Sequence, residues 1–167
     1  MPRRPLVLTG GPAVGKTTTG RTLAAARPAA AFIDLDDVRQ FVVAGHAPVW
    51  EPDGPRQTAL AVRSACAVAR NLLAEGFDVV LADVLDPGTA AAYRAELPGV
   101  LLVHLRVPFV EASRRAATRP VWLTEEEFAW LHRRDAADPP AVDVRLDVGG
   151  MDLPAQVAAV EEVWGRG

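Results

Sequence analysis

The chain contains a single cysteine, and no apolar run in it approaches the length of a membrane-spanning helix. Because Cys66 has no second thiol to pair with, an intramolecular disulfide is excluded. We expect this residue to be a small core side chain in an alanine-rich helix. The N-terminus also lacks the pattern of a signal peptide. These absences predict a cytoplasmic protein that does not associate with a membrane.

Positive charge is not in excess, because the formal net charge is −3. This balance argues against a nonspecific binder of polyanions. The sequence also has no cluster of histidines and cysteines for zinc, and no convincing serine triad. Half of the 167 residues are apolar and 23% are charged, which is typical of a globular protein. We expect one domain over residues 1–167.

Lysine is nearly absent, since Lys16 is the only one and the other seventeen cationic side chains are arginines. Lys16 lies in the phosphate-binding pattern G-x-x-x-x-G-K-[ST]. An ammonium group is compact enough to enter a loop of backbone N–H groups, whereas a guanidinium is wider. The pattern therefore predicts a loop that binds a nucleoside triphosphate, formed by Gly10, Gly11, Pro12, Ala13, Val14, Gly15, Lys16 and Thr17.

The surroundings of this loop support the prediction. Residues 5–8 form an apolar run typical of a buried parallel strand, and residues 17–26 have a helical composition. The start of that helix would add partial positive charge and free N–H donors. We expect Thr17 to place its hydroxyl on Mg²⁺ and Thr18 to be a further phosphate donor.

Apolar runs alternate with helical patterns along the rest of the chain. Further strands are expected at residues 31–33, 79–82, 100–105 and 142–148, the last with one wetter face. Helices are expected near residues 37–44, 57–75, 89–96, 108–118, 124–134 and 153–164. This alternation predicts an α/β fold of three layers, a parallel sheet with helices on both faces. Ligands of such sheets bind at the carboxyl ends of the strands.

Three acids, Asp34, Asp36 and Asp37, follow the second predicted strand. A carboxylate there would face the transferring phosphate and take the proton of an acceptor hydroxyl. We expect Asp36 to be this base, with Asp37 and Asp34 as alternatives, and one of the three to cap the next helix. Arg39 lies one turn after Asp36, where it either holds an anionic or hydroxyl-rich acceptor or is a solvated surface residue.

Asp83 ends the third predicted strand. It either holds Mg²⁺ through water, touches the acceptor, or caps a turn. Asp86 precedes Pro-Gly and is expected to be a turn residue. His46 and Trp50, in the loop at residues 45–56, would line an acceptor pocket near the acids, although a lone loop histidine is more often solvated.

Arg115 and Arg119 are four residues apart, hence on one face of the helix after the fourth strand. Their position at the end of this helix predicts a small helical lid over the phosphates, approximately residues 114–134. Both arginines would neutralise the charge that develops during phosphoryl transfer. Three aromatic residues are expected to pack the lid on the body rather than stack on a base: Trp122, Phe128 and Trp130.

These residues resemble small P-loop kinases of the nucleoside-monophosphate-kinase-like type. The group includes chloramphenicol phosphotransferase, gluconate and adenylylsulfate kinases and the kinase domain of polynucleotide kinase. The resemblance rests on residues 10–17 and 34–39, on Asp83 and on the Arg115/Arg119 pair. It implies a P-loop NTPase fold with a five-stranded sheet of order 2-3-1-4-5, and ATP with Mg²⁺. It also implies an acceptor-activating aspartate at Asp36, an acceptor-binding arginine at Arg39 and lid arginines at Arg115 and Arg119.

The expected function is an ATP-dependent transfer of the γ-phosphoryl group to a hydroxyl of a small molecule, such as a metabolite, nucleoside or antibiotic. One alternative is a 5′-hydroxyl polynucleotide kinase, which the acidic balance disfavours, although Arg39, Arg56 and Arg63 could form a basic stripe. Another is an ATP-binding regulator with weak hydrolysis. A GTPase switch is excluded because its Asn-Lys-x-Asp element needs a second lysine. The acceptor, and the choice between monomer and homodimer, stay open.

Overall fold

A five-stranded, wholly parallel sheet of order β2-β3-β1-β4-β5 forms the centre of the molecule. The structure is a computed structural model that describes residues 4–118 and 123–166. Its strand order and parallel pairing confirm the prediction. The strands are β1 (Leu6–Thr9), β2 (Ala30–Asp34), β3 (Asp78–Ala82), β4 (Leu101–Arg106) and β5 (Val144–Asp147).

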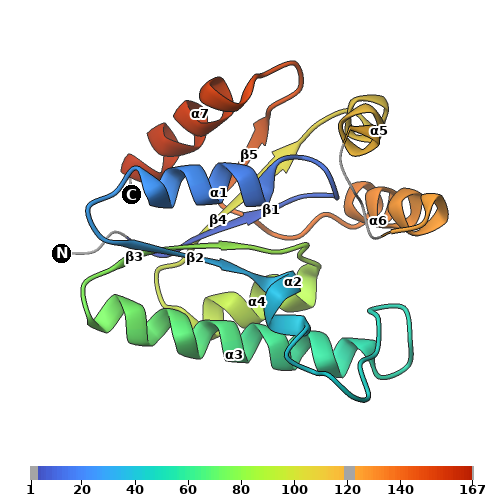
Figure 1. The fold of residues 1–167 in the computed structure, drawn as a ribbon, viewed down its shortest axis with the longest axis horizontal. Coiled ribbons are helices and arrows are strands. Elements are labelled where there is room, and N and C mark those ends of the chain that lie inside the picture. The colour runs from blue at the N-terminus through green and yellow to red at the C-terminus, as the bar shows by residue number, and fades with distance from the viewer. Residues whose placement is uncertain (1–3, 119–122, 167) are drawn as a thin grey trace.

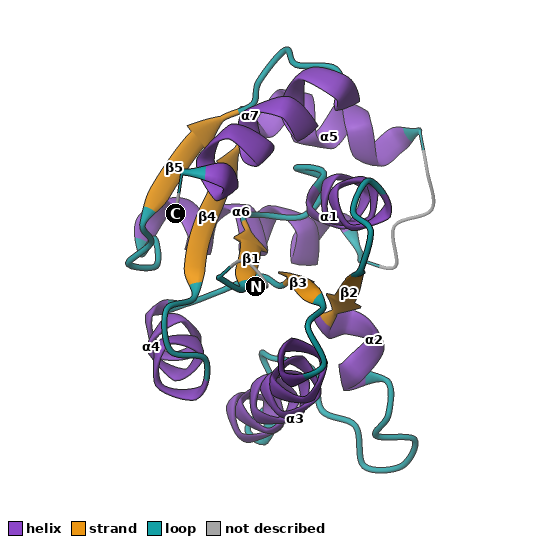
Figure 2. Cartoon of the chain, turned by 90° about the vertical axis from the view of Figure 1, so that its left-hand side faces the viewer, coloured by secondary structure: helices purple, strands orange, loops and turns teal. Residues whose placement is uncertain are grey.

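Helices cover both faces of this sheet, which confirms the three-layer prediction (Figures 1 and 2). On one face lie α1 (Lys16–Ala25) and α7 (Leu153–Gly165), and on the other α3 (Gly54–Ala74) and α4 (Pro87–Glu96). Past the carboxyl ends of the strands lie α5 (Phe109–Ala117) and α6 (Glu125–Ala137) (Figure 1). No helix within residues 4–118 and 123–166 is long and apolar enough to cross a bilayer.

The core consists of two apolar clusters, one on each side of the sheet. Strand β1 contributes to both, because successive side chains point to opposite faces: Val7 packs on the α3/α4 side, Leu6 and Leu8 on the α1/α7 side. Cys66 is buried in the α3/α4 cluster, as predicted, and burial raises the pKa of its thiol to about 12. Strand β5 at the sheet edge alternates between half-buried and exposed residues, also as predicted.

The helix predicted near residues 37–44 is wrong in position and length, since α2 spans only Leu35–Arg39. It begins early because Asp34, the last residue of β2, accepts a hydrogen bond from the backbone N–H of Asp36 at 3.0 Å and so caps it. It ends early because the next apolar side chains have nothing to pack on: Phe41 is 74% and Val43 94% exposed. The other helices begin and end within about three residues of the predicted bounds.

Candidate active site

The segment between β1 and α1 forms a tight loop at the carboxyl end of the sheet. Gly10 and Gly15 have φ angles of 138° and 97°, where only glycine is unstrained. A Cβ atom on Gly10 would lie 2.3 Å from the carbonyl oxygen of Leu105, so no larger residue fits. Ala13 also has a positive φ of 62°, a strain of about 1 kcal/mol for a residue with a side chain. The backbone of this loop is therefore held in a specific shape at some energetic cost.

The start of α1 is open to an anion. Gly15 precedes the helix without a side-chain cap, and the first turn contains no acidic residue. The first N–H groups of α1, including that of the exposed Thr18, therefore have no side-chain acceptor, and the helix dipole adds positive charge beside them. This is the arrangement that a polyphosphate requires.

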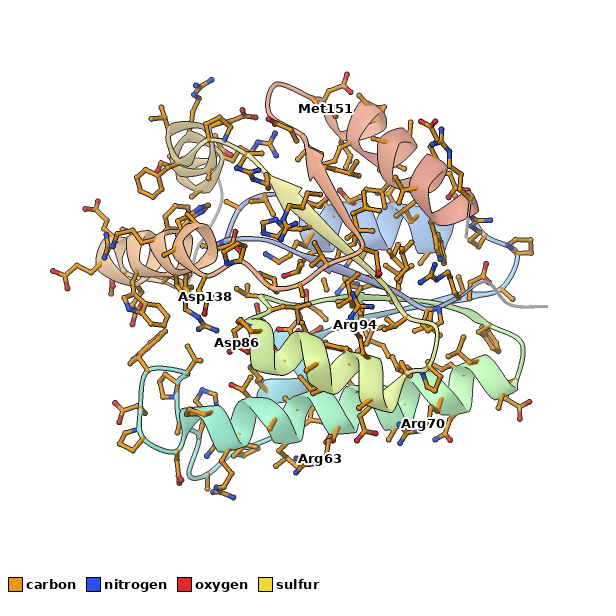
Figure 3. The ribbon with its side chains drawn as sticks, turned by 180° about the vertical axis from the view of Figure 1, so that it is seen from behind. Arg63, Arg70, Asp86, Arg94, Asp138 and Met151 are labelled. Atoms are coloured by element: carbon orange, nitrogen blue, oxygen red, sulfur yellow. The ribbon has the colours of Figure 1, made fainter. Side chains whose placement is uncertain are left out.

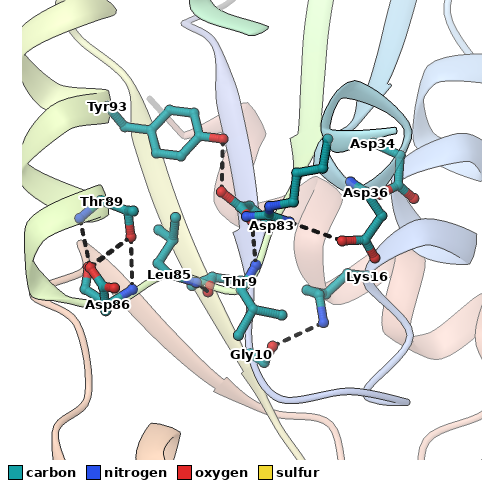
Figure 4. A network of polar contacts seen from close by, with 12 residues as sticks. Thr9, Gly10, Lys16, Asp34, Asp36, Asp83, Leu85, Asp86, Thr89 and Tyr93 are labelled. Atoms are coloured by element: carbon teal, nitrogen blue, oxygen red, sulfur yellow. Dashed lines mark hydrogen bonds and ion pairs between the residues drawn. The ribbon is translucent and has the colours of Figure 1, made fainter. Parts of the chain in front are cut away.

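Lys16 folds back over the loop (Figure 4). Its Nζ donates hydrogen bonds to the carbonyl oxygens of Gly10, at 2.9 Å, and Gly11, at 2.8 Å. Burial lowers the pKa of Lys16, whereas Asp36 and Asp83, among other carboxylates, act in the opposite direction. The ammonium group is thus held between the loop backbone and the acids at the strand ends.

Gln156 of α7 stabilises the loop between β1 and α1 through hydrogen bonds, a role that the sequence analysis did not predict. Its buried amide donates to the carbonyl of Val14 and to the hydroxyl of Thr19, both at 3.0 Å. A Cβ atom on Gly15 would lie 2.6 Å from the same amide. In the sequence, this role is indicated only by the position of Gln156, four residues before the apolar Val160 and therefore on the same face of the helix.

The carboxylate of Asp34 accepts hydrogen bonds from both α1 and α2. The Thr17 hydroxyl donates to its Oδ2 at 2.9 Å, while its Oδ1 accepts from the backbone of Asp36. A hydroxyl and a carboxylate side by side are the hard oxygen ligands that Mg²⁺ prefers. Thr17 and Asp34 therefore fit a metal ion next to the phosphate loop.

Asp83 forms an ion pair with Arg39, and Figure 4 shows it beside Tyr93. The side chain of Asp83 is fully buried, and its Oδ1 accepts from Arg39 at 2.7 Å and from the backbone N–H of Val84 at 2.8 Å. Its Oδ2 accepts from the hydroxyl of Tyr93 at 3.1 Å. Because protein donors occupy both oxygens, this geometry does not favour the water-mediated contact with Mg²⁺ that the sequence predicted for Asp83. That role stays a prediction.

The charges of this pair are shifted by burial and by each other. Burial raises the pKa of Asp83, although Arg39 opposes the shift. Burial alone would lower the pKa of Arg39, but the adjacent Asp83 outweighs it and the pKa is raised. Burial, followed by the charge of Asp83, raises the pKa of Tyr93. Arg39 is thus a permanent cation inside the site.

Asp36, the predicted base, lies in the first turn of α2. It is exposed, and its Oδ1 accepts from Arg39 at 2.9 Å, so Arg39 bridges Asp36 and Asp83. Asp37 instead points to Arg21 of α1, at 3.8 Å. The structure therefore gives the three acids different surroundings, and the role of Asp36 as the base stays a prediction.

Helix α6 packs against the phosphate loop. His132 donates from Nε2 to the carbonyl of Pro12 at 2.8 Å, and burial lowers the pKa of His132. Phe128 is buried against Phe109 and His132, which confirms its predicted packing role. Trp122, another predicted packing residue, lies outside the described residues.

Two further contacts anchor the second half of α6, and no motif pointed to either. Arg134 pairs with Asp86 at 2.6 Å, and Asp135 contacts Nε2 of His104 on β4 at 2.9 Å. Asp86 was expected to be a turn residue, but it is the N-cap of α4, in a capping box with Thr89. Whether the segment at residues 114–134 moves as a lid stays a prediction.

Of the two predicted lid arginines, the structure describes only Arg115. Arg115 lies beside the phosphate loop, 3.4 Å from the carbonyl of Val14, but its guanidinium is paired with Glu111 at 2.5 Å. Its role in transfer stays a prediction. Arg119 lies outside the described residues.

The loop at residues 45–56 contacts α6. Trp50 meets Trp130 edge to face, with ring centroids 6.3 Å apart, so Trp130 contacts this loop and is 37% exposed. Gln57 holds the loop through the carbonyl of Gly45 and the N–H of Ala47. His46, between these two residues, is exposed, and its role in acceptor binding stays a prediction.

The three arginines considered for a basic stripe do not point in one direction. Arg39 is turned inward onto Asp36 and Asp83. Arg56 pairs with Asp53 at 3.4 Å, and Arg63 lies on the outer side of α3 (Figure 3). The structure therefore offers no continuous basic track along these residues.

Comparisons with known proteins identify the fold. No protein-family model matches the sequence, and neither does any curated protein. Among solved structures, a sugar kinase from Janibacter sp. superposes with a TM-score of 0.70 at 19% identity, over 99% of this chain and 95% of that one. A gluconokinase from Sinorhizobium meliloti gives 0.70 at 19% identity, over 99% and 94%. A shikimate kinase from Bacteroides thetaiotaomicron gives 0.68 at 17% identity, over 96% and 97%. The chain has the fold of small-molecule P-loop kinases, as its resemblance implied.

Proposed function

We propose that the protein is an ATP-dependent kinase that transfers the γ-phosphoryl group of ATP to a hydroxyl group of a small molecule. The observation that carries this proposal is the placement of Lys16 and Asp36 at one end of the sheet (Figure 4). One belongs to a loop shaped for phosphates and the other is an exposed carboxylate that Arg39 holds at 2.9 Å. Phosphoryl transfer needs little beyond positioning, charge neutralisation and such a carboxylate.

Each part of this site has a separate role in the transfer. The loop backbone, the start of α1 and Lys16 bind the phosphates, and Lys16 neutralises charge on the transferring group. Thr17 and Asp34 would hold Mg²⁺, which supplies further charge neutralisation when bound. The acceptor oxygen bonds to the γ-phosphorus while the bond from that phosphorus to the bridging oxygen of ADP breaks. Asp36 takes the hydroxyl proton, and Arg39 holds Asp36 in place.

Two observations favour a small acceptor over a polynucleotide. Gluconokinase and shikimate kinase, which share the fold, are named for small hydroxyl compounds. The arginines needed for a nucleic-acid track are turned inward, paired with Asp53 or on the outer side of α3. An ATP-binding regulator has the same phosphate loop, but it would not need a base beside a bridging arginine.

The test is mass spectrometry of a reaction with ATP, Mg²⁺ and a panel of hydroxyl compounds. The panel holds nucleosides, sugars, sugar acids, amino sugars, hydroxylated antibiotics and a short 5′-hydroxyl oligonucleotide, and the Lys16→Ala variant is the blank. We expect one class of small compound to gain one phosphoryl group. Phosphorylation of the oligonucleotide alone would replace this proposal with the polynucleotide alternative. ATP loss without any phosphorylated product would favour the regulator.

A further inference from the structure

A hollow of about 480 Å³, the α6 hollow, is lined by residues of β4, β5 and α6 and by Gly11 of the phosphate loop. Among the described residues, its lining contains three arginines and one carboxylate: Arg106, Arg133, Arg145 and Asp135. From this composition we infer a second ligand site, which binds a small hydroxylated compound that carries a phosphate or carboxylate group. Neither Lys16 nor Asp36 lines the hollow, so the inference goes beyond the proposed kinase function and does not depend on it.

The two strands bring three side chains of the hollow to one face of the sheet. His104 and Arg106 are two residues apart on β4, so both point to the same face. Arg145 of β5 lies opposite His104 in the parallel register, which places it beside them. Helix α6 lies against this face, because its Asp135 contacts Nε2 of His104 at 2.9 Å. The α6 hollow therefore lies between that helix and the edge of the sheet.

The two arginines on the strands are not neutralised by the protein. Within residues 4–118 and 123–166, neither Arg106 nor Arg145 forms an ion pair. Asp147, which is opposite Arg106 in the register, instead accepts from the backbone N–H of Gly149 at 3.0 Å. Arg145 donates to the carbonyl of Pro140 at 3.1 Å, a contact that orients its guanidinium without removing its charge. Both guanidinium groups therefore have donors left for an anion, which they can bind through two parallel hydrogen bonds.

Arg133 reaches the hollow from α6. It also borders the neighbouring hollow beside Trp50 and Trp130, which three glutamates line, but in the described part of the chain it forms no ion pair with them. The carboxylate of Asp135 is engaged with His104. An anion in the α6 hollow would thus join the helix to the two strands through arginines from both sides.

His104 leaves a further polar group without a partner. Its ring is 3% exposed, and its Nδ1 is buried without a hydrogen-bond partner among the described residues. Because the ionised Asp135 can only accept, Nε2 carries the proton and Nδ1 is an acceptor. An unpaired buried acceptor is unfavourable. Since His104 lines the hollow, a ligand hydroxyl that enters beside it would supply the missing donor.

The size and the walls of the hollow favour an organic anion over an inorganic ion. A volume of about 480 Å³ is within the range of small-molecule sites, about 300–1,000 Å³. Apolar side chains form part of the wall, among them Val107, Phe109, Ala129 and Ala136. These side chains would contact the carbon skeleton of the ligand, while the arginines bind its anionic group.

The test is calorimetric titration with one scaffold in three forms: glucose 6-phosphate, gluconate and neutral glucose. The full chain is used with Lys16→Ala, which weakens anion binding at the phosphate loop. We expect at least one of the two anions to bind, and glucose to bind at least about tenfold more weakly. Failure of both anions to bind, or equal affinity for glucose, overturns the inference.

Arg145→Gln and Arg106→Gln, each added to the Lys16→Ala protein, test the residues. Each removes an exposed charge of the hollow, so we expect the Kd of the anion to rise at least about tenfold. Arg63→Gln is the matched control, because Arg63 is an exposed arginine on the outer side of α3 (Figure 3), and its loss should leave the Kd unchanged. Urea unfolding checks that all three variants are folded. An unchanged Kd in both hollow variants, or an equal loss in the control, overturns the inference.

Discussion

The guanidinium of Arg39 lies 2.7 Å from the buried carboxylate of Asp83. This contact joins α2, which follows one strand, to the end of the neighbouring strand β3. The other arm of Arg39 reaches Asp36 at 2.9 Å, so the buried pair orients the carboxylate that we assign as the base. A contact inside the protein thereby orients the exposed side chain that we propose as the base.

Asp83→Asn is expected to destabilise the protein, because it removes the buried carboxylate partner of Arg39 and leaves only the exposed Asp36 to compensate a largely buried guanidinium. Removal of one partner of a buried ion pair costs about 3 kcal/mol. Tyr93→Phe removes only one hydrogen bond to Asp83 and should cost about 1 kcal/mol. Urea unfolding of both variants measures the difference, and equal losses would contradict the central place of the Arg39–Asp83 pair.

Asp36→Asn is expected to keep ATP binding and lower the rate of phosphoryl transfer by about two orders of magnitude or more, because the amide cannot take the acceptor proton. Asp37→Asn is the matched control, since Asp37 is exposed and faces Arg21 on α1. Single-turnover kinetics with the identified acceptor measures both. Loss of transfer in the control alone would move the base to Asp37.

Lys16→Arg is expected to be as inactive as Lys16→Ala. The loop holds a compact ammonium between the carbonyls of Gly10 and Gly11, at 2.9 and 2.8 Å, and a planar guanidinium does not fit there. Kinase assays and ATP titrations of both variants test this. Activity near that of the wild type in the arginine variant would mean that positive charge alone is sufficient.

Asp34→Asn is expected to raise the Mg²⁺ concentration for half-maximal activity at least tenfold. It weakens a metal ligand beside Thr17 but still caps α2, because asparagine is an equally good N-cap. The measurement is a magnesium titration of kinase activity. A larger shift in the Asp83→Asn variant would instead support the contact of Asp83 with Mg²⁺ that the sequence predicted.

Acid is expected to weaken the packing of α6 on the phosphate loop. Burial lowers the pKa of His132 below its ordinary value of 6.5, so the unfolded chain takes up this proton before the folded protein does. The stabilisation from His132 is therefore fully present above about pH 6.5 and is lost as the pH falls from that value through the lower pKa of the folded protein. The His132→Gln variant still offers an N–H to the carbonyl of Pro12. Its free energy of unfolding should therefore fall less than that of the wild type when the pH is lowered by about two units, from about 7.5 to about 5.5. Urea unfolding at both pH values measures this difference. An identical pH dependence in both proteins would contradict this role.

By itself the sequence determined the phosphate loop, the alternation of strands and helices, and the acids at the strand ends. These features depend on residues close together in the chain: the glycine spacing around Lys16, the apolar run before it, and the acids of residues 34–37 after an apolar run. Local backbone preferences and side-chain periodicity are sufficient for such predictions. The misplaced α2 shows the limit, because its length depends on whether Phe41 and Val43 find a core to pack on.

Only the tertiary structure decided what these side chains contact. Arg39 and Asp83 are 44 residues apart, Asp86 and Arg134 are 48, and Val14 and Gln156 are 142. Each pair meets because separate elements pack around one sheet, and neither periodicity nor spacing along the chain encodes that meeting.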